Sequence, residues 1–332
     1  MMKSIPNQKN LPHGILIISL DFELYWGVRD KRSLAAYAAN LEAVHKIVPR
    51  LLTLFTRYQI HTSWATVGLL FAQNEQEAVA FSPAIKPHYS ETQLDAYQEF
   101  TKTNLTESYY FACNLIKKIQ QTPHQEIASH TFSHYYCLEP GQTCEQFQAD
   151  LNSATNIAQA NNTSLQSLVF PRNQYNDDYL HIAAQAGFKT FRGNEHAYIH
   201  KPRNQAQLSL AIRGFRLLDS YLNLTGHHCY PLPNTTKLPI NLPSSCFYRA
   251  YSHQLRHFEW LKHRRIKQGL KQAAKTHKIY HLWWHPHNFG KHMEHNFEQL
   301  ESLCHYYQEL QKKYGMQSMN MGEIYNSFYG NE

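Results

Sequence analysis

The chain has 332 residues, of which 42% are hydrophobic and 13% aromatic. This composition supplies a sizeable core and excludes a disordered chain. The formal charge of +7 is spread along the sequence, so we expect no nucleic-acid partner. No apolar stretch has the length of a signal peptide or of a bilayer-spanning helix, and a cytoplasmic protein is therefore expected.

Short apolar runs alternate with longer amphipathic runs along the chain. In chain order, the sequence predicts a strand at 15–20, a helix at 34–58 with Pro49 as a potential break, strands at 61–68 and 126–130, a helix at 143–161, a strand at 167–170, a helix at 177–187, strands at 188–193 and 278–285, and a helix at 294–313. A capping box formed by Thr143 and Gln146 marks the start of the second of these helices. The alternation favours a parallel sheet covered by helices, either open or closed into a barrel.

The pattern is weakest over residues 195–250. We interpret this stretch as an irregular insertion within one domain that spans residues 10–330. In parallel α/β folds, the residues that carry chemistry gather at the carboxyl ends of the strands. Four polar groups, far apart in sequence, follow predicted strands in this chain, and we therefore expect them to share one site.

The first group is Asp21 and Glu23 in "SLDFELYWG". Side chains two residues apart on an extended backbone point to the same side, so both carboxylates can face one pocket. One carboxylate can then bind a metal while the other acts as a base. The alternative interpretation is a strand end with two solvated acids.

The second group is His130 and His134 in "SHTFSH". Two neutral imidazoles and one carboxylate form a plausible site for a divalent metal. With 22 histidines in the chain, an isolated H-x-x-x-H pattern is weak. Its position after a strand, together with the carboxylate pair after another strand, favours the metal site.

The last two groups are Arg172 in "VFPRNQYN" and the pair His285 and His287 in "HLWWHPHNFG". An arginine at a strand end can orient a carboxylate and keep it ionised. A histidine beside aromatic side chains can have a shifted pKa. A surface arginine and an ordinary buried aromatic strand are the alternatives.

The set, in this order, resembles the polysaccharide deacetylase family, also called the NodB-homology family or carbohydrate esterase family 4. The segments "SLDFE", "SHTFSH", "FPRNQY" and "LWWH" are similar to four of its motifs, and "SHTFSH" is the closest of them. The resemblance implies a distorted (β/α)7 barrel of the polysaccharide deacetylase (NodB) type. It also implies a metal-dependent hydrolase that removes an N-acyl group, acetyl or formyl, from a sugar.

The resemblance further implies roles for individual residues. Asp21 would be the general base and Arg172 would orient it. His285 would be the general acid, with His287 as the rival. The implied metal ligands are Glu23, His130 and His134. Zinc fits this ligand set first, and iron, cobalt or nickel also fit it.

The sequence departs from the family's motifs at several positions. Phe22 separates the two carboxylates, so the division of base and ligand between Asp21 and Glu23 stays open. The usual proline after the arginine precedes Arg172 here. The aspartate pair of a further family motif is not evident, and Asp219 is the one weak candidate.

The expected partner is a carbohydrate, and more specifically a polysaccharide precursor linked to a nucleotide or to a lipid phosphate. Residues 249–278 form a basic amphipathic segment, which can contact an anionic membrane or serve as an outer helix of the barrel. Two alternatives to the sugar deacylase remain: an amidase acting on a small non-sugar amide, and a non-catalytic carbohydrate-binding protein with the same fold.

Overall fold

The computed structural model describes residues 11–102 and 105–330. The strands are β1 (Ile15–Phe22), β2 (Thr62–Thr66), β3 (Gln125–Ser129), β4 (Ser167–Leu168), β5 (Thr190–Phe191), β6 (Ile240–Asn241), β7 (Cys246–Phe247), β8 (Ile279–Trp284) and β9 (Gln317–Ser318). The helices are α1 (Leu34–Tyr58), α2 (Glu75–Phe81), α3 (Glu107–Tyr110), α4 (Cys113–Gln120), α5 (Cys144–Ala160), α6 (Asp177–Gln185), α7 (Leu210–Leu222), α8 (Glu259–Thr276), α9 (Met293–Tyr314) and α10 (Met321–Phe328). Every strand and helix predicted from the sequence is present, with boundaries shifted by a few residues.

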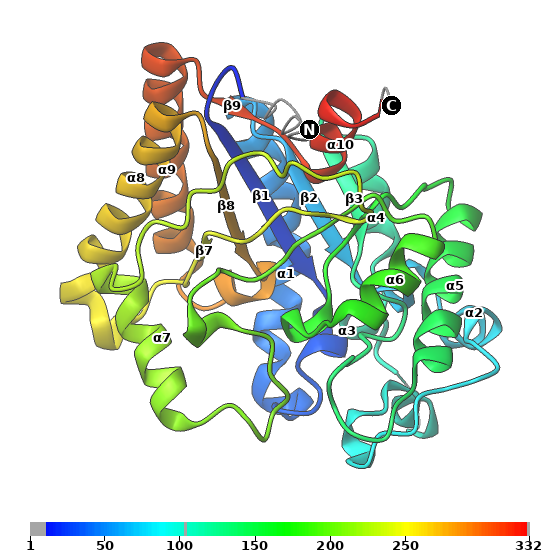
Figure 1. Cartoon of the computed structure of the whole chain (residues 1–332). Coiled ribbons are helices and arrows are strands. Elements are labelled where there is room, and N and C mark those ends of the chain that lie inside the picture. The colour runs from blue at the N-terminus through cyan, green and yellow to red at the C-terminus, as the bar shows by residue number, and fades with distance from the viewer. Residues whose placement is uncertain (1–10, 103–104, 331–332) are drawn as a thin grey trace, which may run out of the picture.

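The strands form one parallel sheet in the order β6-β5-β4-β3-β2-β1-β8-β7, and β9 pairs with β1. Helices cover its outside, with α8 and α9 along one side, α5 and α6 along the other, and α1 behind the central strands (Figure 1). All eight residues of β1 are buried, as expected for a strand covered on both faces. This arrangement confirms the predicted α/β barrel architecture.

The two edges of the sheet are joined by the short segment 242–245. The backbone N–H of Ser244 donates to the carbonyl of Gly193, beyond β5, at 2.8 Å. The N–H of Ser245 donates to the carbonyl of His281 on β8, also at 2.8 Å. Since β6 and β7 flank this segment, it bridges the open side and closes a distorted barrel.

Two expectations about local structure need correction. Pro49 lies inside α1 without breaking it, and the helix runs unbroken to Tyr58. Residues 195–250 are not simply an irregular insertion, because they contain α7 and contribute β6 and β7 to the sheet. Two-residue strands carry too few residues for an alternating pattern, and this explains why the sequence did not reveal them.

The basic segment 249–278 contains α8, which packs on α9, β8 and β1. Its apolar residues Ile266 and Leu270 are buried against the barrel, and so are the basic residues Lys262 and Arg265. The outer-helix interpretation of this segment is therefore confirmed. No helix in the described part of the chain is both long enough and apolar enough to cross a membrane.

Candidate active site

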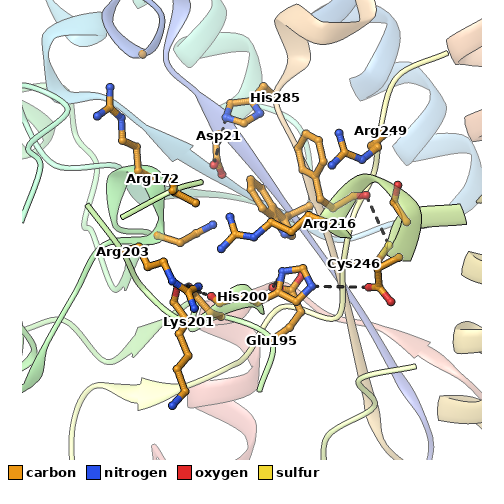
Figure 2. A pocket seen from close by; sticks show the side chains of 18 of the residues that line it. Asp21, Arg172, Glu195, His200, Lys201, Arg203, Arg216, Cys246, Arg249 and His285 are labelled. Atoms are coloured by element: carbon orange, nitrogen blue, oxygen red, sulfur yellow. Dashed lines mark hydrogen bonds and ion pairs between the residues drawn. The ribbon is translucent and has the colours of Figure 1, made fainter. Parts of the chain in front are cut away.

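The predicted polar groups meet at the carboxyl ends of three strands. Asp21 is the last residue but one of β1, His130 directly follows β3, and His285 directly follows β8. Together with Glu23 and His134 they line one pocket of about 330 Å³. Figure 2 shows Asp21 and His285 at one end of this pocket and Glu195 and His200 at the other. The convergence expected from the sequence is thus found.

The candidate metal ligands Glu23, His130 and His134 lie in direct contact. Nε2 of His134 lies 3.0 Å from Oε2 of Glu23, and Nε2 of His130 lies 3.4 Å from the same oxygen. All three side chains are buried, and one ligand atom from each lies within 4.8 Å of the others. Two imidazole nitrogens and a carboxylate oxygen form a donor set that suits zinc and neighbouring divalent ions.

The protonation of both histidines suits metal binding. Nδ1 of His130 lies 2.8 Å from the carbonyl oxygen of Val169, which can only accept. Nδ1 of His130 therefore carries a proton and donates it to this carbonyl, which leaves Nε2 directed at the cluster. Burial lowers the pKa of His134 to about 4 despite the opposing effect of Glu23, so this imidazole is neutral at pH 7.

The loop that carries these histidines is held by Asp150 of α5. The carboxylate of Asp150 accepts from the backbone N–H of Phe132 at 2.7 Å and of Ser133 at 3.1 Å, and from the Ser133 hydroxyl. Thr131 and His134 have φ values of 62° and 59°, which side-chain-bearing residues rarely adopt. The bonds to Asp150 stabilise this tight turn and so bring the two imidazoles together.

Glu23 is positioned by a close approach to Gly27. A Cβ atom at residue 27 would lie 1.9 Å from Cδ of Glu23 and just over 2 Å from both carboxylate oxygens. The 3₁₀ helix Leu24–Gly27 folds the backbone directly over the Glu23 side chain. Glycine at this position therefore leaves the space that the carboxylate occupies.

Asp21 forms a buried bidentate ion pair with Arg192. The two guanidinium nitrogens lie 2.7 and 2.8 Å from the two carboxylate oxygens, and both residues are at least 97% buried. Burial opposes ionisation of Asp21, but Arg192 and His130 outweigh it, and the pKa of Asp21 lies below its ordinary value. Asp21 is consequently a fixed, ionised carboxylate beside the candidate metal ligands.

The prediction that Arg172 orients Asp21 is wrong about the contact. Arg172 lines the same pocket, but it pairs with Asp30 and with Glu139, the latter at 3.2 Å, and lies over the ring of Tyr136. The arginine that forms the ion pair with Asp21 is Arg192. Both arginines follow short strands, and the three-dimensional path of the barrel decides which of them reaches the carboxylate.

Arg192 is itself held by a hydrogen-bonded chain. Its guanidinium donates to the Ser19 hydroxyl at 3.0 Å and to Asn173 at 3.0 Å, and lies over the ring of Trp283. Ser19 in turn lies 2.8 Å from Nε2 of His281, whose Nδ1 lies 3.0 Å from the carbonyl of Leu242. His281 therefore carries its proton on Nδ1 and accepts from Ser19, a contact that the sequence did not predict.

His285 and His287 occupy different environments. Nε2 of His285 lies 3.7 Å from Asp21 and 3.6 Å from Glu23, and its side chain reaches the pocket. His287 is buried behind it, with Nε2 3.9 Å from Glu23. Burial and the neighbouring His285 lower the pKa of His287 to about 3. His285 is therefore the histidine that a bound substrate can reach.

The rest of the pocket wall is strongly basic. The lining contains more cationic than acidic side chains: the cations are Lys31, Arg172, Lys201, Arg203, Arg216, Arg249 and Arg265, and the acids are Asp21, Glu23, Glu195 and Asp219. Asp219 is already paired with Arg265 at 2.9 Å. Arg216 lies at the centre of the pocket in Figure 2, and burial together with Arg203 and Arg249 lowers its pKa against the effect of Glu195.

A family model described as polysaccharide deacetylase matches residues 40–191, just under half of the chain. The matched segment includes "SHTFSH" but neither the Asp21 nor the His285 segment. A search of curated protein sequences finds no match.

Several solved structures share the fold. A "putative polysaccharide deacetylase" from Mycobacterium smegmatis superposes with a TM-score of 0.56 at 12% identity, covering 99% of this chain and 93% of that one. A 4-alpha-glucanotransferase from Thermococcus litoralis gives 0.54 at 10% identity, covering 96% of this chain but only 41% of that one. A GH57-type branching enzyme from Pyrococcus horikoshii gives 0.52 at 12%, covering 96% and 71%. The chain thus has a (β/α) barrel of the polysaccharide deacetylase (NodB) type, and residues 40–191 match the model of that family.

Proposed function

We propose that this protein is a metal-dependent hydrolase that removes an N-acyl group, acetyl or formyl, from a sugar. The observation that carries the proposal is the juxtaposition of Glu23, His130 and His134 with the Arg192-held carboxylate of Asp21 in one pocket. A carbohydrate-binding protein would need neither a metal ligand set nor an adjacent buried base. The family match to residues 40–191 supports the same reaction class.

Glu23, His130 and His134 would hold the divalent metal. When bound, such a metal polarises the acyl carbonyl and lowers the pKa of water toward about 7. The imidazole of His134 is neutral and the carboxylate of Glu23 is ionised, which are the protonation states that ligation requires of them, and His130 directs its Nε2 to the same place. We propose zinc first, with iron, cobalt or nickel as alternatives.

Asp21 would act as the general base and accept the proton of the attacking water. The two bonds from Arg192 fix the direction of its carboxylate and keep it ionised. His285 would protonate the departing amine, since it lines the pocket within 4 Å of both carboxylates. His287, buried and neutral, would support His285 from behind.

The proposed substrate carries phosphate, as a nucleotide-linked or lipid-phosphate-linked sugar precursor does. Arg216 and Arg249 support this, because both line the pocket and neither forms a salt bridge with an acid in the described structure. Desolvated guanidinium groups are suited to bidentate binding of a phosphate. A small non-sugar amide would leave this basic wall without a partner.

The proposed function is tested by assaying purified protein, with defined metal content, on N-acetylated and N-formylated sugars. The panel should contain neutral oligosaccharides, nucleotide-linked sugars and a small non-sugar amide. We expect release of acetate or formate from a phosphate-bearing sugar, and none by the Asp21→Asn variant. If the protein hydrolyses only the small amide, the assignment of a sugar substrate is contradicted. If the metal-loaded protein hydrolyses no member of the panel, the proposal of a hydrolase is contradicted.

A further inference from the structure

Helix α7 carries its apolar side chains on the outside of the protein. Leu210 is 83% exposed, Phe215 42%, and Leu218 and Leu222 52% each, with Leu217 also exposed. The buried residues of α7 are polar or amphipathic, namely Asp219, Ser220 and Tyr221. An ordinary surface helix has the opposite arrangement, with its apolar side against the core. We name Leu210, Phe215, Leu217, Leu218 and Leu222 the α7 apolar face.

Exposed apolar side chains are concentrated around this face. In the described residues, the large exposed hydrophobic side chains outside residues 198–260 are Val79 and Ile85. The others are Tyr198, Leu224, Phe258, Trp260 and the α7 apolar face. Helix α7 packs against α8 and against the 3₁₀ helix Tyr198–His200, so these residues belong to neighbouring elements. Figure 1 shows α7 and α8 on the same side of the barrel. Grouped exposure of this kind indicates an interaction surface.

The charge of this region selects the partner. Residues 198–260 contain seven lysine or arginine side chains and two acids: Lys201, Arg203, Arg213, Arg216, Lys237, Arg249 and Arg256, and Asp219 and Glu259. Both acids are buried in ion pairs, Asp219 with Arg265 and Glu259 with Lys262, whereas Arg213 and Arg256 are exposed. The surface around the α7 apolar face is therefore apolar and cationic, without an exposed acidic side chain.

We propose that the α7 apolar face docks on the surface of an anionic lipid bilayer. An amphipathic helix binds such a surface by placing leucine and phenylalanine side chains among the acyl chains while neighbouring basic groups contact the headgroups. Docking removes from water the apolar side chains that the barrel leaves exposed. Helix α7 lies on the bilayer and does not cross it.

Docking has a consequence for the pocket. Helix α7 also supplies Arg216, Asp219 and Ser220 to the pocket lining, so the same helix connects the apolar face to the basic wall. A bilayer bound to the outside of α7 brings lipid headgroups close to the pocket. The substrate class that fits a pocket at the bilayer surface is then a sugar carried on a lipid phosphate. This substrate assignment rests on the proposed function, whereas the docking of α7 on the bilayer does not.

The experiment is co-sedimentation of the full chain with vesicles of phosphatidylcholine alone and of phosphatidylcholine with phosphatidylglycerol. We expect binding to the anionic vesicles that weakens with added salt, and little binding to the neutral ones. The double variant Leu218→Gln and Leu222→Gln should bind anionic vesicles about tenfold more weakly or worse. The matched control is Val79→Gln and Ile85→Gln, whose side chains are 51% and 52% exposed elsewhere, and it should bind like the wild type.

A second pair of variants tests the charges. Arg213→Glu with Arg256→Glu should weaken binding, while Lys271→Glu with Lys275→Glu, on the exposed side of α8, should not. The Asp21→Asn variant should sediment like the wild type, which separates docking from the proposed reaction. If the wild type does not bind anionic vesicles, the proposal is overturned. It is also overturned if the Leu218/Leu222 variant and the Val79/Ile85 variant lose vesicle binding to the same extent. Self-association that the Leu218 and Leu222 changes abolish, without vesicle binding, would instead assign this face to a second copy of the chain.

Discussion

Arg192 and Asp21 form a bidentate ion pair at the carboxyl end of the barrel, with N–O distances of 2.7 and 2.8 Å and neither side chain exposed beyond 4%. The pair joins β5 to β1, across three intervening strands of the sheet order. A buried carboxylate that accepts two hydrogen bonds from one guanidinium has a single orientation. The proposed general base, Asp21, is therefore in position before the substrate binds.

Replacing Arg192 by lysine should reduce kcat by about 10- to 100-fold, because an ammonium group cannot hold both carboxylate oxygens. The pKa of Asp21 should rise once the guanidinium is lost, and the acid limb of the pH–rate profile should move to higher pH. The control is Arg172→Lys, which leaves the Asp21 pair intact. An unchanged acid limb in Arg192→Lys would contradict the assignment of Arg192 as the positioning residue.

The variants Asp21→Asn and Glu23→Gln should show which of the two carboxylates is the general base and which is the metal ligand. The first change should lower turnover by about 100-fold or more while bound metal is retained, since a proton acceptor is lost and no ligand is removed. The second should weaken metal affinity, because a carboxylate ligand becomes a neutral amide. Metal content after dialysis and kcat are the measurements. If Asp21→Asn loses the metal and Glu23→Gln keeps it, the two roles are reversed.

Gly27→Ala should lower metal affinity although residue 27 is no ligand. Its new Cβ would overlap the Glu23 carboxylate at 1.9 Å, so the carboxylate has to move. Gly214→Ala is a suitable control, because a Cβ there meets nothing within 4 Å and the residue lies in α7. Equal metal affinity in both variants, measured by competition with a chelating dye, would show that Glu23 does not bind the metal in its observed position.

His281 should make the folded state sensitive to acid. Burial, followed by the nearby Arg192, lowers the pKa of His281 from 6.5 to about 3. The unfolded chain therefore binds the extra proton first, and stability present above pH 6.5 is lost as the pH falls toward 3. Between these values His281 alone should change the free energy of unfolding by about 1.4 kcal/mol per pH unit.

The measurement is urea unfolding of wild type and His281→Gln at several pH values in that window. As the pH falls, the free energy of unfolding should decrease less steeply for the variant than for the wild type, and the two slopes should differ by the uptake of about one proton. The remaining buried histidines titrate in both proteins and cancel in the comparison. Parallel slopes would mean that His281 is protonated in the folded protein.

Much of the fold and of the site could be predicted from strand ends. The buried runs before Asp21, His130 and His285 identified the strands, and the parallel arrangement then required their carboxyl ends to meet. Arg192 lies at the carboxyl end of the strand predicted at 188–193, so the same rule could have nominated it beside Arg172. Choosing between them requires the path of the backbone, which no local pattern contains.

Other features could not be predicted from the sequence, for different physical reasons. Pro49 lacks an N–H and was therefore a potential break in its helix, but α1 is continuous and its apolar side is packed in the core. The apolar residues of α7 have helical spacing, and spacing alone does not say whether that side faces the core or the solvent. Only the structure shows that it faces outward.

The most direct test of the proposed metal site is the metal content of the purified protein combined with its thermal stability. Because a ligand that binds the folded state stabilises it, added zinc should raise the Tm of metal-stripped wild type. The same addition should have little effect on His134→Ala, and the untreated wild type should contain about one divalent ion per chain. Wild-type protein without bound metal, and without any gain in Tm on adding zinc, iron, cobalt or nickel, would contradict the metalloenzyme.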